Sequence, residues 1–188
     1  KKLQTDYIDL LLVHQPFGDY YGTYRAMEEA YKAGQVRAIG VSNFSPNRFI
    51  DLQYFVEIKP AINQIETHVF YQQKEAKKYL EKYNCQIESW GPFAEGKNDF
   101  FNTPLLKEIG EKYGKSVAQV ALRFLLQSNV VVIPKSVRKE RMQENFDIFD
   151  FELTEDEMKS IEGLDQGSTL FHNHQEPETA ERFLSFLS

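Results

Sequence analysis

The sequence is poor in three things: cysteine, positive charge and long apolar runs. A single cysteine, Cys85, excludes an internal disulfide and is consistent with a reducing compartment. The net charge of −6 argues against a nucleic-acid surface, because contact with phosphates relies on clustered Lys and Arg. No apolar run approaches the roughly 18 residues that would indicate a membrane span, and no secretion signal is recognisable. We therefore expect a cytoplasmic protein whose partners include neither nucleic acid nor membrane.

Two further kinds of site are disfavoured by spacing. The four histidines, His14, His68, His172 and His174, lack the partner spacing of zinc ligands, so we expect no metal. Cys85 has no base beside it and makes a poor candidate nucleophile.

What the sequence does contain is a repeated alternation of strand-like and helix-like segments. With 41% hydrophobic and 14% aromatic residues, the chain can build a sizeable core. Apolar runs at residues 8–13, 36–41, 61–65, 85–88 and 130–133 predict five strands. Helical periodicity and caps predict helices at residues 24–33, from 45, and at 73–83, 104–113, 116–127, 138–146 and from 154. This order is typical of an α/β fold. Because no linker divides the chain, we predict one domain over residues 1–188.

Each predicted strand is followed by a polar cluster. The clusters are His14-Gln15-Pro16, Ser42-Asn43-Phe44, Asn63-Gln64-Ile65-Glu66, Ser89-Trp90-Gly91-Pro92 and Lys135-Ser136-Val137-Arg138. This layout is typical of a β/α barrel, whose functional residues lie at the carboxyl ends of the strands. A closed barrel of this type needs eight strands, and the chain supplies five and starts at Lys1. We therefore expect the C-terminal part of a larger barrel.

His14 follows the first strand and precedes a Gln-Pro pair that excludes helical geometry. A neutral imidazole there can donate a hydrogen bond to a carbonyl oxygen and stabilise the charge that develops during reduction. The alternative is a histidine that caps the strand end through a backbone group.

The next three strand ends carry further candidates. Ser42, Asn43 and Gln64 offer a hydroxyl and two amides, which together can hold a primary carboxamide; the alternative is ordinary loop capping. Trp90 can stack on a heteroaromatic ring or pack in the core. The residues from Gly91 to Gly96 are small enough to let backbone N–H groups approach a phosphate, although they match no glycine-rich fingerprint.

The last cluster is basic. Lys135, Ser136 and Arg141 follow the fifth strand and open the next helix, which is a favourable place for a phosphate in barrels. The alternative is a solvated basic helix face. A small basic cluster in an acidic chain suits a single small anion better than a polymer.

Taken in order, these motifs resemble those of the aldo-keto reductases. The resemblance is carried by residues 8–16, 40–44, 63–66, 133–136 and 141–145 and extends from about Leu3 to the tail. The stretches 14–19 and 91–96 are most similar to the bacterial branch that includes diketogluconate reductases. The resemblance implies a (β/α)8 TIM barrel of which only the C-terminal five β/α units are present. One additional helix precedes the helix at 116–127, and another follows the last paired helix.

The family resemblance also implies a cofactor, a substrate class and residue roles. The cofactor is NADP(H), bound in extended form without a Rossmann domain, and the substrate is a small carbonyl compound. In this scheme His14 orients the carbonyl group. The residues implied at the cofactor are Ser42, Asn43 and Gln64 at the carboxamide, Trp90 stacked on the nicotinamide, Gly91 and Phe93 near the pyrophosphate, Lys135, Ser136, Val137 and Arg141 at the 2′-phosphate, and Glu144 and Asn145 at the adenine.

Two departures limit what the resemblance implies. Gly91 stands where many members carry Ser, so a backbone contact replaces a side-chain contact. The Tyr that donates the proton, with its Lys and Asp, belongs to early strands that this chain lacks. We expect an NADPH-dependent carbonyl reductase by descent whose 188 residues alone do not turn over substrate, with possible self-association through exposed sheet edges. The alternatives are a non-catalytic NADP(H)-binding remnant, completed or not by another chain, and a sensor or accessory subunit.

Overall fold

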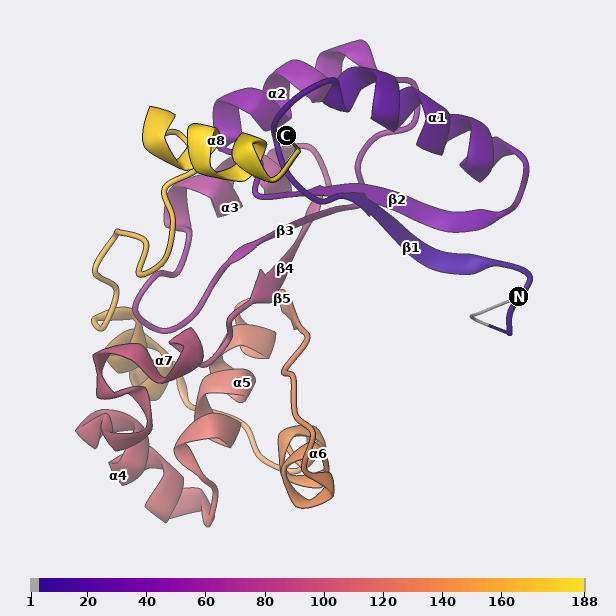
Figure 1. The fold of residues 1–188 in the computed structure, drawn as a ribbon. Coiled ribbons are helices and arrows are strands. Elements are labelled where there is room, and N and C mark those ends of the chain that lie inside the picture. The colour runs from indigo at the N-terminus through magenta and orange to yellow at the C-terminus, as the bar shows by residue number, and fades with distance from the viewer. Residues whose placement is uncertain (1–3, 188) are drawn as a thin grey trace. The chain divides into compact units, whose positions relative to one another are not determined.

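The computed structural model describes residues 4–187 of the chain, whose course is traced in Figure 1. Residues 1–3, where the family resemblance begins, lie outside the described residues. The chain divides into two compact units. The first comprises the residues up to 65, residues 74–87 and those from 172 onward; the second comprises residues 66–73 and 88–171. The prediction of a single domain stays a prediction, and each unit is described by itself.

The first unit is built around parallel strands. Its elements are β1 (Ile8–Val13), α1 (Tyr20–Lys32), β2 (Val36–Ser42), α2 (Pro46–Phe55), β3 (Ile62–Glu66), α3 (Lys74–Lys82), α8 (Pro177–Leu184) and a final 3₁₀ turn, η2 (Ser185–Leu187). Strand β1 pairs with β2 in parallel, and β2 pairs with β3 so that Ser42 lies opposite Gln64. Helix α1 packs on β1 and β2 (Figure 1). The parallel pairing aligns the carboxyl ends of these strands, which is where the predicted site residues lie.

The second unit is mainly helical. Strand β4 (Gln86–Trp90) enters it from the first unit and is followed by η1 (Ala94–Asn102), α4 (Pro104–Tyr113), α5 (Val117–Gln127), β5 (Val130–Val132), α6 (Lys139–Phe146) and α7 (Glu155–Glu162). Helix α5 packs against β5, α4 and α6. The five strands are hydrogen-bonded in the order β1-β2-β3-β4-β5, which is also their order along the chain.

Each unit has its own buried core. In the first, Tyr24, Phe49 and Leu52 are fully buried; in the second, Phe100 and Leu122 are. Close approach between strands requires a glycine at Gly40 of β2, because a Cβ there would lie 2.5 Å from the backbone oxygen of Ile62. This approach brings the end of β2 against β3.

The α/β prediction is confirmed, with all five strands present near their predicted positions. Helix α7 begins with a complete capping box between Thr154 and Glu157, as its sequence predicts. Two elements differ. Residues 94–102, which lie outside every predicted helix and strand, form irregular 3₁₀ turns, and the tail contains helix α8, which sequence reasoning missed. The signal available for α8 was Pro177 in its first turn.

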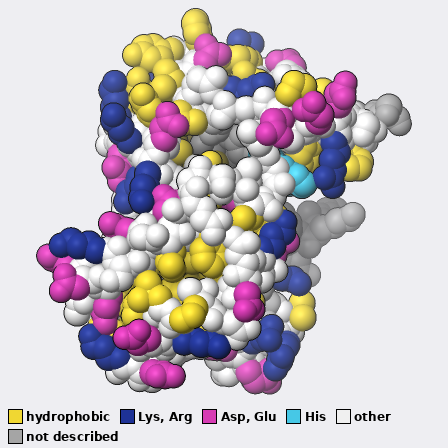
Figure 2. Space-filling model, turned by 90° about the vertical axis from the view of Figure 1, so that its left-hand side faces the viewer, with side chains coloured by type: hydrophobic (Ala, Val, Ile, Leu, Met, Phe, Trp, Pro, Cys, Tyr) yellow, Lys and Arg dark blue, Asp and Glu magenta, His cyan; other side chains and the backbone are white. Residues whose placement is uncertain are grey.

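Charge on the molecular surface is mixed. On the face shown in Figure 2, Lys and Arg side chains alternate with Asp and Glu and do not gather into one basic patch. Within residues 4–187, no helix has the length and apolar character needed to cross a membrane. The same residues include no group of three or more His, Cys, Asp and Glu side chains placed to hold a metal ion.

Candidate functional site

The predicted residues of the first unit meet at the ends of β1, β2 and β3. The Asn43 Nδ2 donates to the backbone oxygen of His14 at 3.2 Å and to Ser42 Oγ at 3.1 Å. The Ser42 hydroxyl donates in turn to the backbone oxygen of Gln64 at 2.8 Å, and the Asn43 N–H donates to the same oxygen at 2.9 Å. The structure therefore brings His14, Ser42, Asn43 and Gln64 together in one hydrogen-bonded cluster.

This strand-end cluster (His14, Ser42, Asn43 and Gln64) has a structural role of its own. Asn43 has a φ of +62°, a left-handed conformation in which Asn is one of the few tolerated residues after glycine. Ser42 is fully buried, whereas the His14 side chain is exposed. The loop-capping alternative is thus realised for Ser42 and Asn43, and the imidazole of His14 remains the exposed polar group of the cluster.

The predicted residues of the second unit line a cavity of about 340 Å³. This volume lies within the range of small-molecule sites. The cavity, called here the basic pocket, is lined by Phe93, Phe101, Ser116, Val117, Ala118, Lys135, Ser136, Arg141, Glu144 and Asn145. Six of these ten were predicted from the sequence. Residues from η1, α5 and α6 and from the loop before α6 thus converge on one space.

The charged side chains of the basic pocket have no partners in the described part of the chain. Within residues 4–187, the side chains of Lys135, Arg141, Glu144 and Asn145 make neither a hydrogen bond nor an ion pair. The Ser136 hydroxyl is engaged locally: it accepts the N–H of Arg138 at 3.1 Å and donates to the Arg138 carbonyl at 3.3 Å. Two unpaired cations that line one pocket, against the single carboxylate of Glu144, are suited to a ligand anion.

The first turn of α5 completes the basic pocket. Sequence reasoning missed this contribution of α5. Ser116 caps this helix by accepting the Gln119 N–H, and Gln119 accepts the Ser116 N–H in return. The N-terminus of an 11-residue helix carries partial positive charge and favours an anion. The signal was present as a Ser cap two residues after Gly114, but nothing in the sequence linked it to the distant Lys135.

Trp90 and Gly91 do not line the basic pocket. Trp90 ends β4 and makes an edge-to-face contact with Phe171, with ring centroids 5.2 Å apart. Gly91 has a φ of +64°, a value that a Ser at this position would adopt only with strain. Four non-glycine residues that follow, Ala94, Glu95, Asn98 and Asp99, also have positive φ. Strain concentrated in one segment is typical of functional loops.

Val137 is the predicted residue that the structure places apart. Its side chain is 80% exposed, and it is not among the residues that line the basic pocket. Its predicted role at the cofactor stays a prediction.

Sequence reasoning also missed a buried pair of titratable residues in the second unit. Glu66 is 4% exposed and His68 is fully buried, with His68 Nε2 3.0 Å from Glu66 Oε1. Among the described residues, His68 Nδ1 has no hydrogen-bond partner. The signal was the Glu at the end of the Asn63-Gln64-Ile65-Glu66 cluster, although no motif of consecutive residues gives this carboxylate a role.

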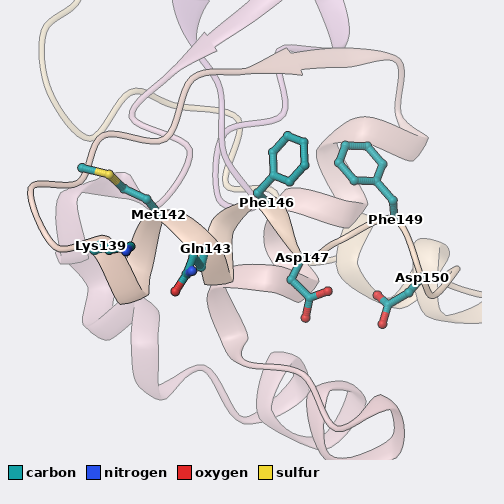
Figure 3. A pocket seen from close by; sticks show the side chains of 7 residues that line it. All are labelled: Lys139, Met142, Gln143, Phe146, Asp147, Phe149 and Asp150. Atoms are coloured by element: carbon teal, nitrogen blue, oxygen red, sulfur yellow. The ribbon is translucent and has the colours of Figure 1, made fainter.

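A second, more open cavity lies beside α6 (Figure 3). Its apolar lining consists of Met142, Phe146 and Phe149, all exposed. Its two carboxylates, Asp147 and Asp150, are held by Lys115 at 2.8 and 2.7 Å. The cavity is therefore an apolar surface with paired charges at its edge and contains no predicted cofactor residue.

Cys85 is unsuited to nucleophilic chemistry. Burial raises the pKa of its thiol to about 12, against a smaller opposing effect of a backbone hydrogen bond at Asn63. The thiol is therefore protonated at neutral pH, as the sequence-based argument expected.

Comparison with known proteins shows which family and which solved structures this chain is similar to. The model of the aldo/keto reductase family matches residues 1–166. Glyoxal reductase of Bacillus subtilis is 45% identical over 94% of this chain, and methylglyoxal reductase DkgA of Escherichia coli is 42% identical over 90% of it. This chain spans 63% of the length of each. A crystal structure of a Gox0644 variant in complex with NADPH is 36% identical and superposes with a TM-score of 0.87. That match covers 92% of this chain and 65% of the other.

The match runs through both compact units and includes the strand ends and the basic pocket. It confirms the resemblance that the ordered motifs carried. The chain belongs to the aldo/keto reductase family.

Proposed function

We propose that this chain is the NADP(H)-binding part of a reductase that converts aldehyde or ketone groups of small molecules to alcohols. The observation that carries the proposal is the basic pocket, which Lys135 and Arg141 both line without forming an ion pair within residues 4–187. The named relatives support the substrate class, since two of them are reductases of glyoxal and methylglyoxal. The structure of a neighbour with NADPH supports the cofactor.

The residues of the basic pocket fit the phosphorylated adenosine end of NADPH. The 2′-phosphate carries about two negative charges, which Lys135, Arg141 and the first turn of α5 would balance. Phe93 and Phe101 offer aromatic surface, and Glu144 and Asn145 offer acceptors for the amino group of adenine. NADH lacks this phosphate, so the same residues predict a preference for NADPH.

The strand-end cluster supplies the other half of the proposal. NADPH supplies a hydride to the carbonyl carbon when it is bound. His14, exposed at the end of β1, would donate a hydrogen bond to the carbonyl oxygen and stabilise the charge that develops there. The hydrogen bond from Asn43 to the His14 backbone oxygen fixes the loop that carries this imidazole.

We further propose that these 188 residues are the C-terminal five β/α units of an eight-stranded barrel. Strands β1 and β5 are the two edges of the sheet. Ile8 on β1 and Val131 on β5 are more than one-third exposed, and the apolar surface of α6 around Phe146 is also open. A further strand and helix at these edges would bury this surface, which would otherwise favour self-association.

Cofactor titration tests the proposal directly. NADPH should quench the fluorescence of Trp90, the only tryptophan, at lower concentration than NADH does. A turnover assay with methylglyoxal would then separate an enzyme from a binding protein. Equal affinity for the two cofactors would contradict the role of the basic pocket. Turnover by the 188 residues alone would contradict the incomplete barrel.

A further inference from the structure

A short segment of the second unit, Thr169–Leu170–Phe171, lies against Trp90 and is held there by side chains. Among the described residues, no backbone–backbone hydrogen bond involves residues 168–172. The preceding residue Gln166 differs, since its N–H donates to the Phe70 backbone oxygen at 2.8 Å. A segment held only through side chains opens at lower cost than one held in a backbone ladder.

Glu66 is the first anchor of this segment. One carboxylate oxygen accepts the Leu170 N–H at 2.8 Å, and the other accepts the hydroxyl of Thr169. The first oxygen also lies 3.0 Å from His68 Nε2. A buried carboxylate must find such donors, so Glu66 and the segment stabilise each other.

Lys97 of η1 is the second anchor. Its ammonium donates to the Leu170 backbone oxygen at 2.6 Å and lies 4.1 Å from the centroid of the Phe171 ring. Leu170 therefore has its N–H bound by Glu66 and its carbonyl bound by Lys97. The Lys97 side chain is exposed and long, which makes this anchor the easier of the two to release.

The anchored segment places Phe171 on Trp90, the side chain that the family resemblance assigns to stacking on the nicotinamide ring. Phe171 meets Trp90 edge to face, and its ring would lie 3.9 Å from a Cβ at Gly91. It also lies near His68, with ring centroids 6.4 Å apart. Trp90 is thus in direct contact with an aromatic ring that comes from the tail.

We propose that residues 169–171 form a strap, positioned by Glu66 and latched by Lys97, that closes over Trp90 and opens to admit the nicotinamide ring. The identity of the entering ring rests on the proposed function, whereas the strap itself rests only on contacts within the second unit. Glu66 and Lys97 are positioning residues here, because they act on Trp90 through the strap. The strap sets the rates at which cofactor enters and leaves.

The experiment measures exposure of Trp90 to a neutral quencher, acrylamide, without cofactor. Thr169→Val removes one hydroxyl donor to Glu66 while conserving shape, and Lys97→Met removes the latch. Lys97→Met loses one hydrogen bond to the strap, and Thr169→Val loses two, because the Thr169 hydroxyl also accepts the Phe171 N–H. Each bond lost raises the open population of the strap by about fivefold. Both variants should increase quenching of Trp90 and should accelerate NADPH association and dissociation together.

Matched controls separate the strap from general loosening. Thr169→Ser keeps the hydroxyl and should restore the quenching and the rates of the unmodified chain. Lys107→Met removes a lysine of the same unit that bonds Asn102 instead of the strap, and should change neither. Thermal melting accompanies each variant. Glu66→Gln should give the largest effect; if it does not fold, the Thr169 and Lys97 variants still decide the result.

Three outcomes are distinguishable. Increased quenching in Thr169→Val and Lys97→Met but not in their controls supports the strap, and faster cofactor exchange supports its role in admission. Quenching equal to that of the unmodified chain overturns the strap, whatever the cofactor does. If NADPH does not bind the unmodified chain, the proposed function fails and admission of the nicotinamide fails with it, while acrylamide quenching still reports on closure.

Discussion

The strand-end cluster and the basic pocket are both built from polar residues that follow strands, yet they use those residues differently. At the strand ends, Ser42 and Asn43 bond to each other and to the backbone of His14 and Gln64. In the basic pocket, Lys135 and Arg141 bond to nothing else in residues 4–187. The first cluster stabilises the fold as well as lining a site. The second carries two cations whose side chains form no ion pair within residues 4–187, so the fold itself does not need them.

This difference predicts which substitutions should change ligand affinity and which should change the free energy of unfolding. Changes in the basic pocket should weaken binding and spare the fold, because no internal bond is lost. Changes in the strand-end cluster should cost folding free energy first. Four predictions test this division, in order of decreasing effect.

The largest effect is expected from Arg141→Ala. Loss of one charged hydrogen-bonding group, worth about 1.5–3 kcal/mol, should weaken NADPH binding by roughly 10- to 150-fold. Binding of NADH should hardly change, and neither should the melting temperature. Isothermal titration calorimetry with both cofactors measures the ratio of the NADPH and NADH dissociation constants. Arg138→Ala, at an exposed arginine outside the pocket lining, is the control. An equal loss of affinity for both cofactors would show that Arg141 does not read the 2′-phosphate.

Asn43→Ala should destabilise the first unit. Alanine at a φ of +62° costs about 1–2 kcal/mol of folding free energy, and the lost bonds to His14 and Ser42 add to this. Asn43→Gly removes the same bonds without the backbone cost and should lie between alanine and the unmodified chain. Urea unfolding measures the free energy of unfolding of the alanine variant, the glycine variant and the unmodified chain. If alanine and glycine prove equal, the left-handed backbone is not a source of the effect.

A smaller effect is expected at Glu157, a hydrogen-bonded carboxylate of the second unit. Burial acts to raise the pKa of Glu157, but hydrogen bonds from Lys112, the Thr154 backbone and Tyr113 outweigh it and lower the pKa to about 2 from an ordinary value of 4.5. A lowered folded-state pKa means that the stabilisation is complete above pH 4.5 and is lost as the pH falls toward 2.

Glu157→Gln should therefore make the melting temperature less dependent on pH between these two values. At neutral pH, the weakened cap should lower the free energy of unfolding by about 1 kcal/mol. The control is Glu144→Gln, which changes a carboxylate without a bond in the described chain. An unchanged acid limb in Glu157→Gln would mean that this carboxylate is not the group that titrates.

The smallest effect is expected from Val137→Ala. An 80%-exposed side chain outside the basic pocket should change stability by less than about 0.5 kcal/mol and leave NADPH affinity intact. A marked loss of affinity would mean that the bound cofactor reaches Val137 after all, and that the pocket extends beyond its present lining.

Several features were predictable because their causes are local. Apolar runs marked the five strands, and the capping box of α7 was legible at Thr154 and Glu157. The polar residues at strand ends were found because parallel strands align their carboxyl ends. Helix α8 was missed because the polar, aromatic composition of the tail carries little helical periodicity.

Other features depended on contacts between distant parts of the chain. The first turn of α5 enters the basic pocket some twenty residues before Lys135, and Phe171 reaches Trp90 from the tail. No sequence pattern near Glu66 indicates that its carboxylate will bind Thr169 and Leu170. Spacing rules describe neighbours on one helix or strand and give no information about such pairs.

By itself, the sequence determined the α/β order of elements, the family and the residue types offered at each strand end, because periodicity and motifs are properties of consecutive residues. Only the tertiary structure decided which of those residues are consumed by the fold and which remain for a ligand. Ser42 and Lys135 are equally polar and equally placed after a strand. What separates them is the set of partners that folding brings within hydrogen-bond distance, and that set is fixed by packing.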